Sequence, residues 1–353
     1  MTKPGVHYPS SEREFRSWFQ TDNDCLDYLD WLRSGGPRVC THCGIVSPAK
    51  EVSGRIWRCP VCKARVSRTA GTIFQDTRTP FTTWFQAAWE LCMDKGGVSA
   101  LTLQRRLELG SYQTAWAMLH RYRSAMGLAG QEKLSGRVEV DETVLGGPKP
   151  GKRGRGAAGK VWVAVAVELK DPKGFGRVRL RVLPDTGSAK SIRAFLIECV
   201  EPGSEIVTDG ANYYTGATKD LYTLSKNNIK GSGLPANVTL PAVHRVASLL
   251  KRWLMGTYQG SYGVDHIETY LDEFTFRFNR RRSPKRGLLF YRLMTLAAQA
   301  APLSYEDIVQ NPVSKPSTAP VGKRSRPKSL AITNPGKPWR STVPEPYDSP
   351  VAQ

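Results

Sequence analysis

The order of strand-like and helix-like segments after Gly136 restricts the fold of this chain more than any other feature. Four segments have the alternating or continuously apolar pattern of strands: 137–143 (RVEVDET), 160–170 (KVWVAVAVELK), 176–186 (GRVRLRVLPDT) and 204–210 (SEIVTDG). Three have helical spacing: 188–200, 241–255 and 265–281. Three strands, a helix, a fourth strand and further helices predict an α/β layer with covering helices.

Two aspartates stand at the ends of apolar strands in this region. Asp141 lies in RVEVDET, and Asp209 ends the strand of SEIVTDG. Because side chains alternate along a strand, Glu139 shares a face with Asp141. Two strand-end carboxylates can meet at one edge of a sheet and hold Mg²⁺ for phosphodiester chemistry. A loop cap is the alternative interpretation of either acid taken alone.

Four cysteines predict a zinc ribbon at residues 36–72. Cys40-x2-Cys43 and Cys59-x2-Cys62 have the spacing of two metal-binding knuckles. The alternatives are four ordinary buried thiols, or a ribbon that only stabilises a small fold. Basic residues surround the pairs and favour a DNA contact: Arg38, Arg55, Arg58, Lys63, Arg65 and Arg68. Cys25, Cys92 and Cys199 lack spaced partners and are expected in the core.

Helical patterns flank this ribbon, in a segment at 1–35 and in three helices within 73–132. Residues 98–126 fit a helix-turn-helix whose second helix enters a DNA groove; a plain helical hairpin is the alternative. The inward face of that second helix is expected to contain Tyr112, Ala115, Trp116, Leu119 and Tyr122. The outer face is expected to contain Gln113, His120, Arg121 and Arg123.

The net charge of +20 indicates a polyanionic partner, since Lys and Arg release counterions from a phosphate backbone. The Pro-rich segment 301–353 is predicted to be a disordered basic tail. The sequence has no 18-residue apolar run, so no membrane span is expected, and the default compartment is the cytoplasm.

Several motifs together resemble one family of enzymes. The series VEVDET, VTDG, LPAVHRVASLLKRWLMGTY and YLDEFTFRFNRR is similar to bacterial insertion-sequence transposases of the DDE type. Within these it resembles the ISXO2-like group, related to the eukaryotic Merlin elements, which carries an N-terminal zinc ribbon. The resemblance spans 12–295 and implies an RNase-H-like mixed sheet flanked by helices as the catalytic domain at 133–300.

The resemblance also implies a third metal ligand and a basic residue on a later helix. The family commonly has Glu at the place of His244, which stands 35 residues after Asp209, and Lys at the place of Lys251. Asp141, Asp209 and His244 would then hold Mg²⁺ or Mn²⁺, with Lys251 near the scissile phosphate. Alternatively, His244 makes a local hydrogen bond at a helix start, and Glu139 or Glu268 supplies the missing carboxylate.

The implied activity is transposition: binding of terminal inverted repeats, hydrolysis of one strand, and joining of the 3′-hydroxyl to target DNA. The partners would be double-stranded DNA and further copies of the chain on paired ends, in the cytoplasm at the nucleoid. The expected DNA contacts are Arg153, Arg155, Lys160, Arg245, Lys251, Arg252, Arg280 and Arg281. Two alternatives stay open: a non-catalytic DNA-binding regulator, and a nuclease that cleaves without joining.

Overall fold

The computed structural model of the protein describes residues 3–34, 38–40, 42–47, 54–128, 132–146, 160–170, 174–185, 187–227, 239–260 and 262–310. The strands are β1 (Arg38–Val39), β2 (Val46–Ser47), β3 (Ile56–Arg58), β4 (Arg65–Ser67), β5 (Arg137–Leu145), β6 (Val161–Leu169), β7 (Phe175–Val182), β8 (Glu205–Thr208) and β9 (Thr223–Lys226). The helices are α1 (Glu12–Trp18), α2 (Asp22–Ser34), α3 (Phe81–Met93), α4 (Ala100–Arg106), α5 (Tyr112–Gly127), α6 (Ala189–Cys199), α7 (Tyr213–Thr218), α10 (Pro241–Tyr258), η2 (Val264–His266), α11 (Ile267–Asn279), α12 (Arg286–Ala297) and α13 (Tyr305–Gln310).

A five-stranded mixed sheet has the order β7-β6-β5-β8-β9. β5, β6 and β7 pair antiparallel, whereas β8 pairs parallel to β5 and β9 parallel to β8. On the parallel side of β5, Glu139 lies opposite Val207. Continuing this register by two residues brings Asp209 alongside Asp141 on the same face. The expected α/β sheet with covering helices is confirmed.

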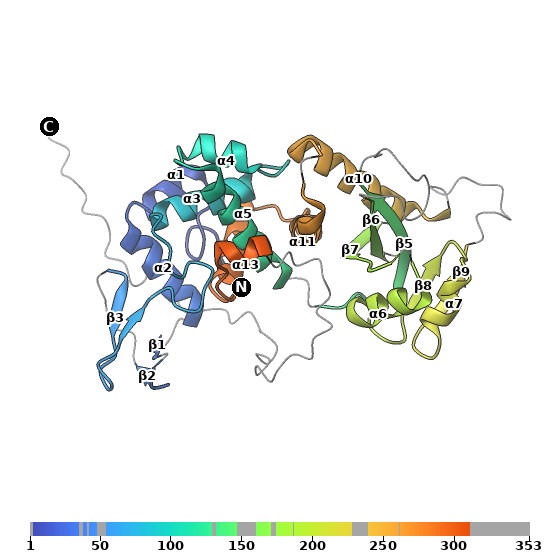
Figure 1. Cartoon of the computed structure of the whole chain (residues 1–353), viewed down its shortest axis with the longest axis horizontal. Coiled ribbons are helices and arrows are strands. Elements are labelled where there is room, and N and C mark those ends of the chain that lie inside the picture. Colours follow the sequence, from blue (N-terminus) through green and yellow to red (C-terminus); the bar gives the residue numbers. More distant parts are fainter. Residues whose placement is uncertain are drawn as a thin grey trace.

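Each face of the sheet has its own hydrophobic core. Val138 and Val140 are fully buried on the face covered by α6 and α7. On the other face, Val165 packs with Val246 and Leu250 of α10. The apolar residues of α10 recur every three or four positions, so one stripe of the helix is buried and the opposite side faces solvent. Figure 1 shows α10 on one side of the sheet and α6 with α7 on the other.

A second unit of structure consists of helices and has an aromatic core. The ring of Phe290 lies 5.6 Å from that of Phe15 and 5.5 Å from that of Trp89. Phe290 belongs to α12, so the chain returns to the N-terminal helices after completing the sheet. A Cβ atom at Gly287 would lie 1.8 Å from the carbonyl oxygen of Pro9, so only glycine fits this contact.

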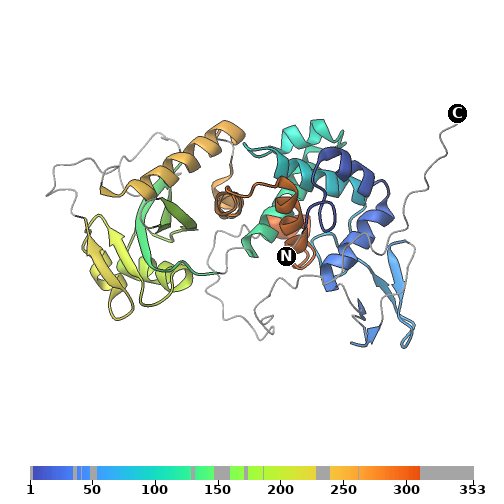
Figure 2. The ribbon, with the colours of Figure 1, turned by 180° about the vertical axis from the view of Figure 1, so that it is seen from behind.

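Helix α11 lies between the sheet and the helical unit, and contacts both β7 and α5 (Figures 1 and 2). A buried ion pair joins α5 to α11: Arg123 Nε donates to Glu273 Oε2 at 2.8 Å, and both side chains are at most 1% exposed. The same carboxylate receives Arg277 Nε at 2.9 Å and the hydroxyl of Tyr258 at 3.2 Å. These donors satisfy a charge that is fully removed from water.

The expected outer face of α5 is only partly at the surface. Gln113 is exposed, but Arg123 is buried in the ion pair with Glu273. His120 is 2% exposed, and its Nδ1 lies 3.3 Å from the hydroxyl of Thr269 on α11. The prediction that His120 and Arg123 face DNA is therefore wrong, because α11 covers this side of α5. Arg121 is half-buried and donates to the carbonyl of Leu303.

The inward face of α5 is largely as expected. Ala115, Leu119 and Tyr122 are buried and Trp116 is half-buried, whereas Tyr112, at the first turn, is 47% exposed. The prediction for Tyr112 is wrong because helical spacing alone does not show where along α5 the covering elements end.

The N-terminal helical segment is broken into α1 and α2. Asp24 N–H donates to the Thr21 hydroxyl at 3.2 Å, and Thr21 N–H donates to Asp24 Oδ2 at 2.7 Å. This reciprocal cap starts a new helix at a place where the apolar spacing alone would predict one continuous helix.

The first part of the expected tail is helical, so the prediction of disorder is wrong there. Residues 305–310 form α13, whose Tyr305 ring lies 6.0 Å from that of Trp116, and residues 311–353 lie outside the described residues. Within the described part of the chain, no helix has the length and apolar character needed to cross a membrane.

Replacing Arg123 with alanine should leave the buried Glu273 carboxylate with one cation fewer. We expect the free energy of unfolding to fall by about 3–5 kcal/mol, as when one member of a buried pair is removed. Urea denaturation followed by tryptophan fluorescence measures this. The matched control is Arg16→Ala, which breaks an exposed pair with Glu12. This variant should unfold at nearly the same urea concentration as the wild type. Equal transitions for both variants would contradict a stabilising role for the buried pair.

Candidate functional site

The candidate site lies where the middle of β5 meets the first turns of α10. The distance from Asp141 Oδ2 to His244 Nε2 is 3.9 Å, with the two side chains 22% and 35% exposed. A cavity of about 400 Å³ opens between the two elements. It is lined by Asp141, Glu142, Thr143, Val165, Val243, His244, Ala247, Ser248 and Lys251.

One face of α10 supplies His244 and Lys251 to this cavity. Residues seven positions apart on an α-helix lie two turns apart on the same side, and Ala247 and Ser248 fill the turn between them. Pro241 occupies the first turn, where its fixed φ and missing N–H are tolerated. The helix thus directs an imidazole and an ammonium group to the same space.

Burial and like charge act together on Asp141. Removal from water raises the pKa of Asp141 to about 7, and the carboxylates of Glu142, Asp209 and Glu139 act in the same direction. Asp141 Oδ1 accepts the N–H of Glu142 at 2.8 Å, which opposes that rise and orients the carboxylate. Burial lowers the pKa of His244, and the charge of Lys251 lowers it further.

Asp209 lies beside the cavity and is not among its lining residues. Its Oδ1 accepts the N–H of Ala211 at 3.0 Å, just after β8 ends. The negative charge of Asp209 helps to raise the pKa of Asp141 and opposes the lowering of the pKa of His244, so the three groups are electrostatic neighbours. Among the described residues, however, only the four predicted zinc cysteines form a group of three or more possible ligands lying within 4.8 Å of one another.

The donors at this site fit a hard divalent cation. His244 Nε2 is buried and has no hydrogen-bond partner among the described residues. The neighbouring Asp141 carboxylate is largely desolvated beside three other negative charges. Carboxylate oxygens are the preferred ligands of Mg²⁺, and an imidazole nitrogen suits Mn²⁺ better. A bound cation would relieve the repulsion among these groups.

Glu139 and Glu268, the two alternative candidates for the third carboxylate ligand, have other partners. Glu139 Oε2 accepts the N–H groups of Ala242 and Val243, at 2.8 and 3.1 Å. Glu268 accepts from Arg181 and from the N–H of Val182, both at 2.9 Å, so it belongs to the junction of α11 with β7. Neither lies among the residues that line the cavity.

Sequence reasoning missed Glu142 as a residue of the site. Glu142 is among the residues that line the cavity, and its carboxylate accepts the hydroxyls of Tyr213 and Tyr214, at 2.6 and 2.7 Å. Its position next to Asp141 and the Tyr-Tyr pair four residues after Asp209 were the available signals.

The predicted DNA contacts fall in three groups. Arg245, Lys251 and Arg252 are exposed on α10, and Lys160 is half-buried just before β6. Arg153 and Arg155 lie outside the described residues.

The remaining two predicted contacts are engaged in the fold. Arg280 donates to the carbonyl of Phe276 at 3.1 Å, and burial lowers its pKa to about 10. Arg281 donates to the carbonyls of Phe175 and Gly176, at 2.7 and 3.1 Å, and holds the end of α11 against β7.

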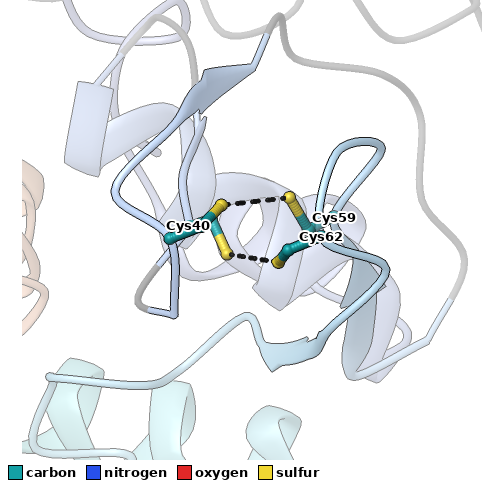
Figure 3. A group of neighbouring side chains, drawn as sticks. Cys40, Cys59 and Cys62 are labelled. Carbon is teal, nitrogen blue, oxygen red and sulfur yellow. Dashed lines mark hydrogen bonds between the residues drawn. The ribbon is translucent and has the colours of Figure 1, made fainter.

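The four predicted zinc cysteines come together at the tips of two hairpins, β1–β2 and β3–β4. The Sγ atoms of Cys40 and Cys62 are 3.7 Å apart, and those of Cys43 and Cys59 are 3.8 Å apart (Figure 3). A tetrahedron of thiolates at the usual Zn–S length of about 2.3 Å has edges of about 3.8 Å. This group could therefore hold a zinc ion.

The two knuckles have the same backbone geometry. The N–H of Gly44 donates to Cys40 O at 2.8 Å, and that of Lys63 donates to Cys59 O at 3.0 Å. Both donors have a left-handed φ, of 70° and 61°, which is unusual for the lysine.

Part of the basic surround of the ribbon has a structural role. Arg68 is 4% exposed and forms ion pairs with Asp27 and Asp30 of α2. Arg55 pairs with Asp22 at 3.0 Å. Arg58, Lys63 and Arg65 are exposed and make no ion pair among the described residues, although Arg58 Nε donates to Lys63 O and Lys63 Nζ donates to Pro60 O.

Comparison with known proteins agrees with this geometry. A family model described as the ISXO2-like transposase domain matches residues 133–279, a shorter range than the motifs alone indicated. A search of curated proteins found no match to this chain. The matched range contains β5 with Asp141, the strand that leads to Asp209, and α10 with His244 and Lys251. Residues 133–279 of this chain are therefore similar to the ISXO2-like transposase domain, which supports a relation to insertion-sequence transposases of the DDE type.

Proposed function

We propose that the protein binds the ends of an insertion sequence and catalyses metal-dependent cleavage and joining of DNA strands. The observation that carries this proposal is the meeting of Asp141, His244 and Lys251 around one cavity. The net charge of +20 supports a DNA substrate. Since two element ends must be brought together, we also propose that more than one copy acts in the assembly.

Asp141, Asp209 and His244 are the proposed metal ligands. When bound, divalent cations would activate the attacking oxygen and stabilise the leaving oxygen of a phosphodiester. The chain orients Asp141 through the N–H of Glu142 and holds His244 in place on the first turns of α10. The lowered pKa of His244 keeps its imidazole neutral at neutral pH, the form that has a lone pair for a ligand.

Lys251 is proposed to contact the DNA next to the reacting phosphate. Its side chain lines the same cavity as Asp141, and its helix continues into the exposed Arg252. An ammonium group is a compact donor for phosphate oxygens. Arg245 on the exposed side of α10 would extend this basic surface along the DNA backbone.

The ribbon is proposed to bind one zinc ion and to contribute to DNA binding. The support is the tetrahedral S···S spacing and the three exposed basic residues of its hairpins. A ribbon that only stabilises this part of the chain is the alternative.

A regulator that binds DNA without cutting it is the second candidate function. It is favoured by a single observation: a neutral imidazole stands at the place of the third carboxylate, so the site has one negative charge fewer.

Replacing Asp141 with asparagine should reduce nicking and joining at least about 100-fold, since ligands matter more than the outer-shell partners whose loss costs 10–100-fold. His244→Ala should reduce both steps similarly, whereas His244→Glu should keep activity with Mg²⁺. The assay uses DNA that carries the flanking element ends, with Mg²⁺ and Mn²⁺ in parallel, and gel-shift measurement of DNA binding as the control.

An inactive wild type with an active His244→Glu variant would mean that this chain lost catalysis by that substitution. If neither the wild type nor any variant nicks or joins DNA, but all of them still bind it, the regulator is favoured over the enzyme.

Purified protein should contain one zinc ion per chain by mass spectrometry, and Cys59→Ser should lose it, because a closed site needs all four thiolates. The helical circular-dichroism signal should persist in this variant, since the helices lie outside the ribbon. Cys199→Ala removes a buried thiol of the sheet core and should retain the zinc. Full zinc content in Cys59→Ser would contradict the site.

A further inference from the structure

We propose that the two glutamates flanking Asp141 on β5 are positioning residues: Glu139 holds the helix that carries His244, and Glu142 holds the segment that follows Asp209. This inference rests on the proposed metal-dependent function and assigns to these two acids a role other than metal binding.

Glu139 supplies the N-terminal cap that α10 lacks. The helix has no side-chain cap of its own and no acidic residue in its first turn. The first N–H groups of a helix have no partner within the helix and favour negative charge. Glu139 Oε2 accepts two of them, from Ala242 and Val243, at 2.8 and 3.1 Å, and the glutamate is 4% exposed. Because His244 follows directly, this contact sets the imidazole against Asp141.

Glu142 performs the corresponding role for the second aspartate. Each of its oxygens accepts one hydroxyl: Oε2 from Tyr213 at 2.6 Å and Oε1 from Tyr214 at 2.7 Å. These short hydrogen bonds to a carboxylate are of the strong, charge-assisted kind. Both tyrosines belong to α7, which starts four residues after Asp209. The bonds therefore hold the chain after β8 against β5, and fix Asp209 relative to Asp141.

Strand alternation separates the two roles. Glu139 and Asp141 point to the face covered by α10, whereas Glu142 points to the face of α7, where Tyr214 is fully buried. The three acids of this strand thus have different partners. Glu139 contacts the start of α10, Asp141 faces His244, and Glu142 contacts α7 on the opposite side of the sheet.

The competing assignment makes Glu142 the missing third carboxylate ligand, since it lines the cavity with Asp141. Turning its carboxylate to a cation would leave two tyrosine hydroxyls without their acceptor, one of them fully buried. An unpaired buried hydroxyl costs free energy that a positioned carboxylate avoids.

The experiment measures Mn²⁺ affinity of the full-length, zinc-loaded chain by calorimetry and electron paramagnetic resonance. The double variant Tyr213→Phe/Tyr214→Phe keeps every carboxylate and removes only the two donors to Glu142. We expect it to bind Mn²⁺ about 10- to 100-fold more weakly, the usual effect of losing outer-shell partners. Tyr222→Phe, whose hydroxyl donates to Val200 O in the same core, should bind as the wild type does.

Two Glu139 variants test the cap. Glu139→Gln retains an oxygen for the two N–H groups and should stay within a few-fold of wild-type affinity, whereas Glu139→Ala should lose about 10- to 100-fold. Faster amide hydrogen exchange at residues 242–243 should accompany the alanine change only. Thermal unfolding by circular dichroism identifies any variant that fails to fold, and the Gln and Phe variants then decide the question.

The proposal is overturned if the tyrosine double variant binds Mn²⁺ as tightly as the wild type or more tightly. It is also overturned if Glu142→Gln loses a bound Mn²⁺ as Asp141→Asn does, since Glu142 is then a ligand. A wild type that binds Mn²⁺ without cutting DNA contradicts only the proposed reaction, and affinity still decides the positioning roles. A wild type that binds no Mn²⁺ overturns both.

Discussion

The structure of the site depends on the pairing of β5 with an antiparallel partner on one side and a parallel partner on the other. The parallel pair with β8 brings Asp209 beside Asp141, although 68 residues separate them in the sequence. The antiparallel pair with β6 fixes which face of β5 is turned to α10. Since a shift of one residue would exchange the faces, both apolar cores enforce the register on which the acidic residues depend.

The helical unit is joined to this sheet by buried polar contacts as well as by apolar packing. Glu273 of α11 accepts from Arg123 of α5 and from Tyr258, the last residue of α10. Arg277 also donates to the carbonyl of Asp94, after α3. The helix that carries His244 is therefore in contact with β5 at its start and with the helical unit at its end. Such networks are costly when incomplete, so they define one arrangement of the two units.

The sequence predicted the elements that have strong periodicity and the residues that have fixed spacing. The strands that carry Asp141 and lead to Asp209, the helix of His244, and the four predicted zinc cysteines were all located from local pattern. It could not show that α12 packs among the N-terminal helices, because the burial of Phe290 depends on residues more than 200 positions away. His120 and Arg123 were assigned to solvent for the same reason: helical spacing gives the angle of a side chain and not the element that covers it. Glu142 was missed because its partners, Tyr213 and Tyr214, lie 71 and 72 residues away in the sequence, and their position after Asp209 indicates a contact only once β5 and β8 are known to be neighbours.

The packing of α12 shows that the boundaries of the matched family domain differ from the boundaries of the packed structure. The recognisable family domain ends at residue 279, yet α11 uses Arg123 of the preceding unit, and α12 completes the core of that unit from beyond the domain. A fragment cut at the family boundaries would uncover the Glu273 carboxylate and leave the aromatic core without Phe290. The matched range thus shares a buried ion pair with the preceding helices, and any exchange of those N-terminal helices with the helices of a similar protein would have to include α12.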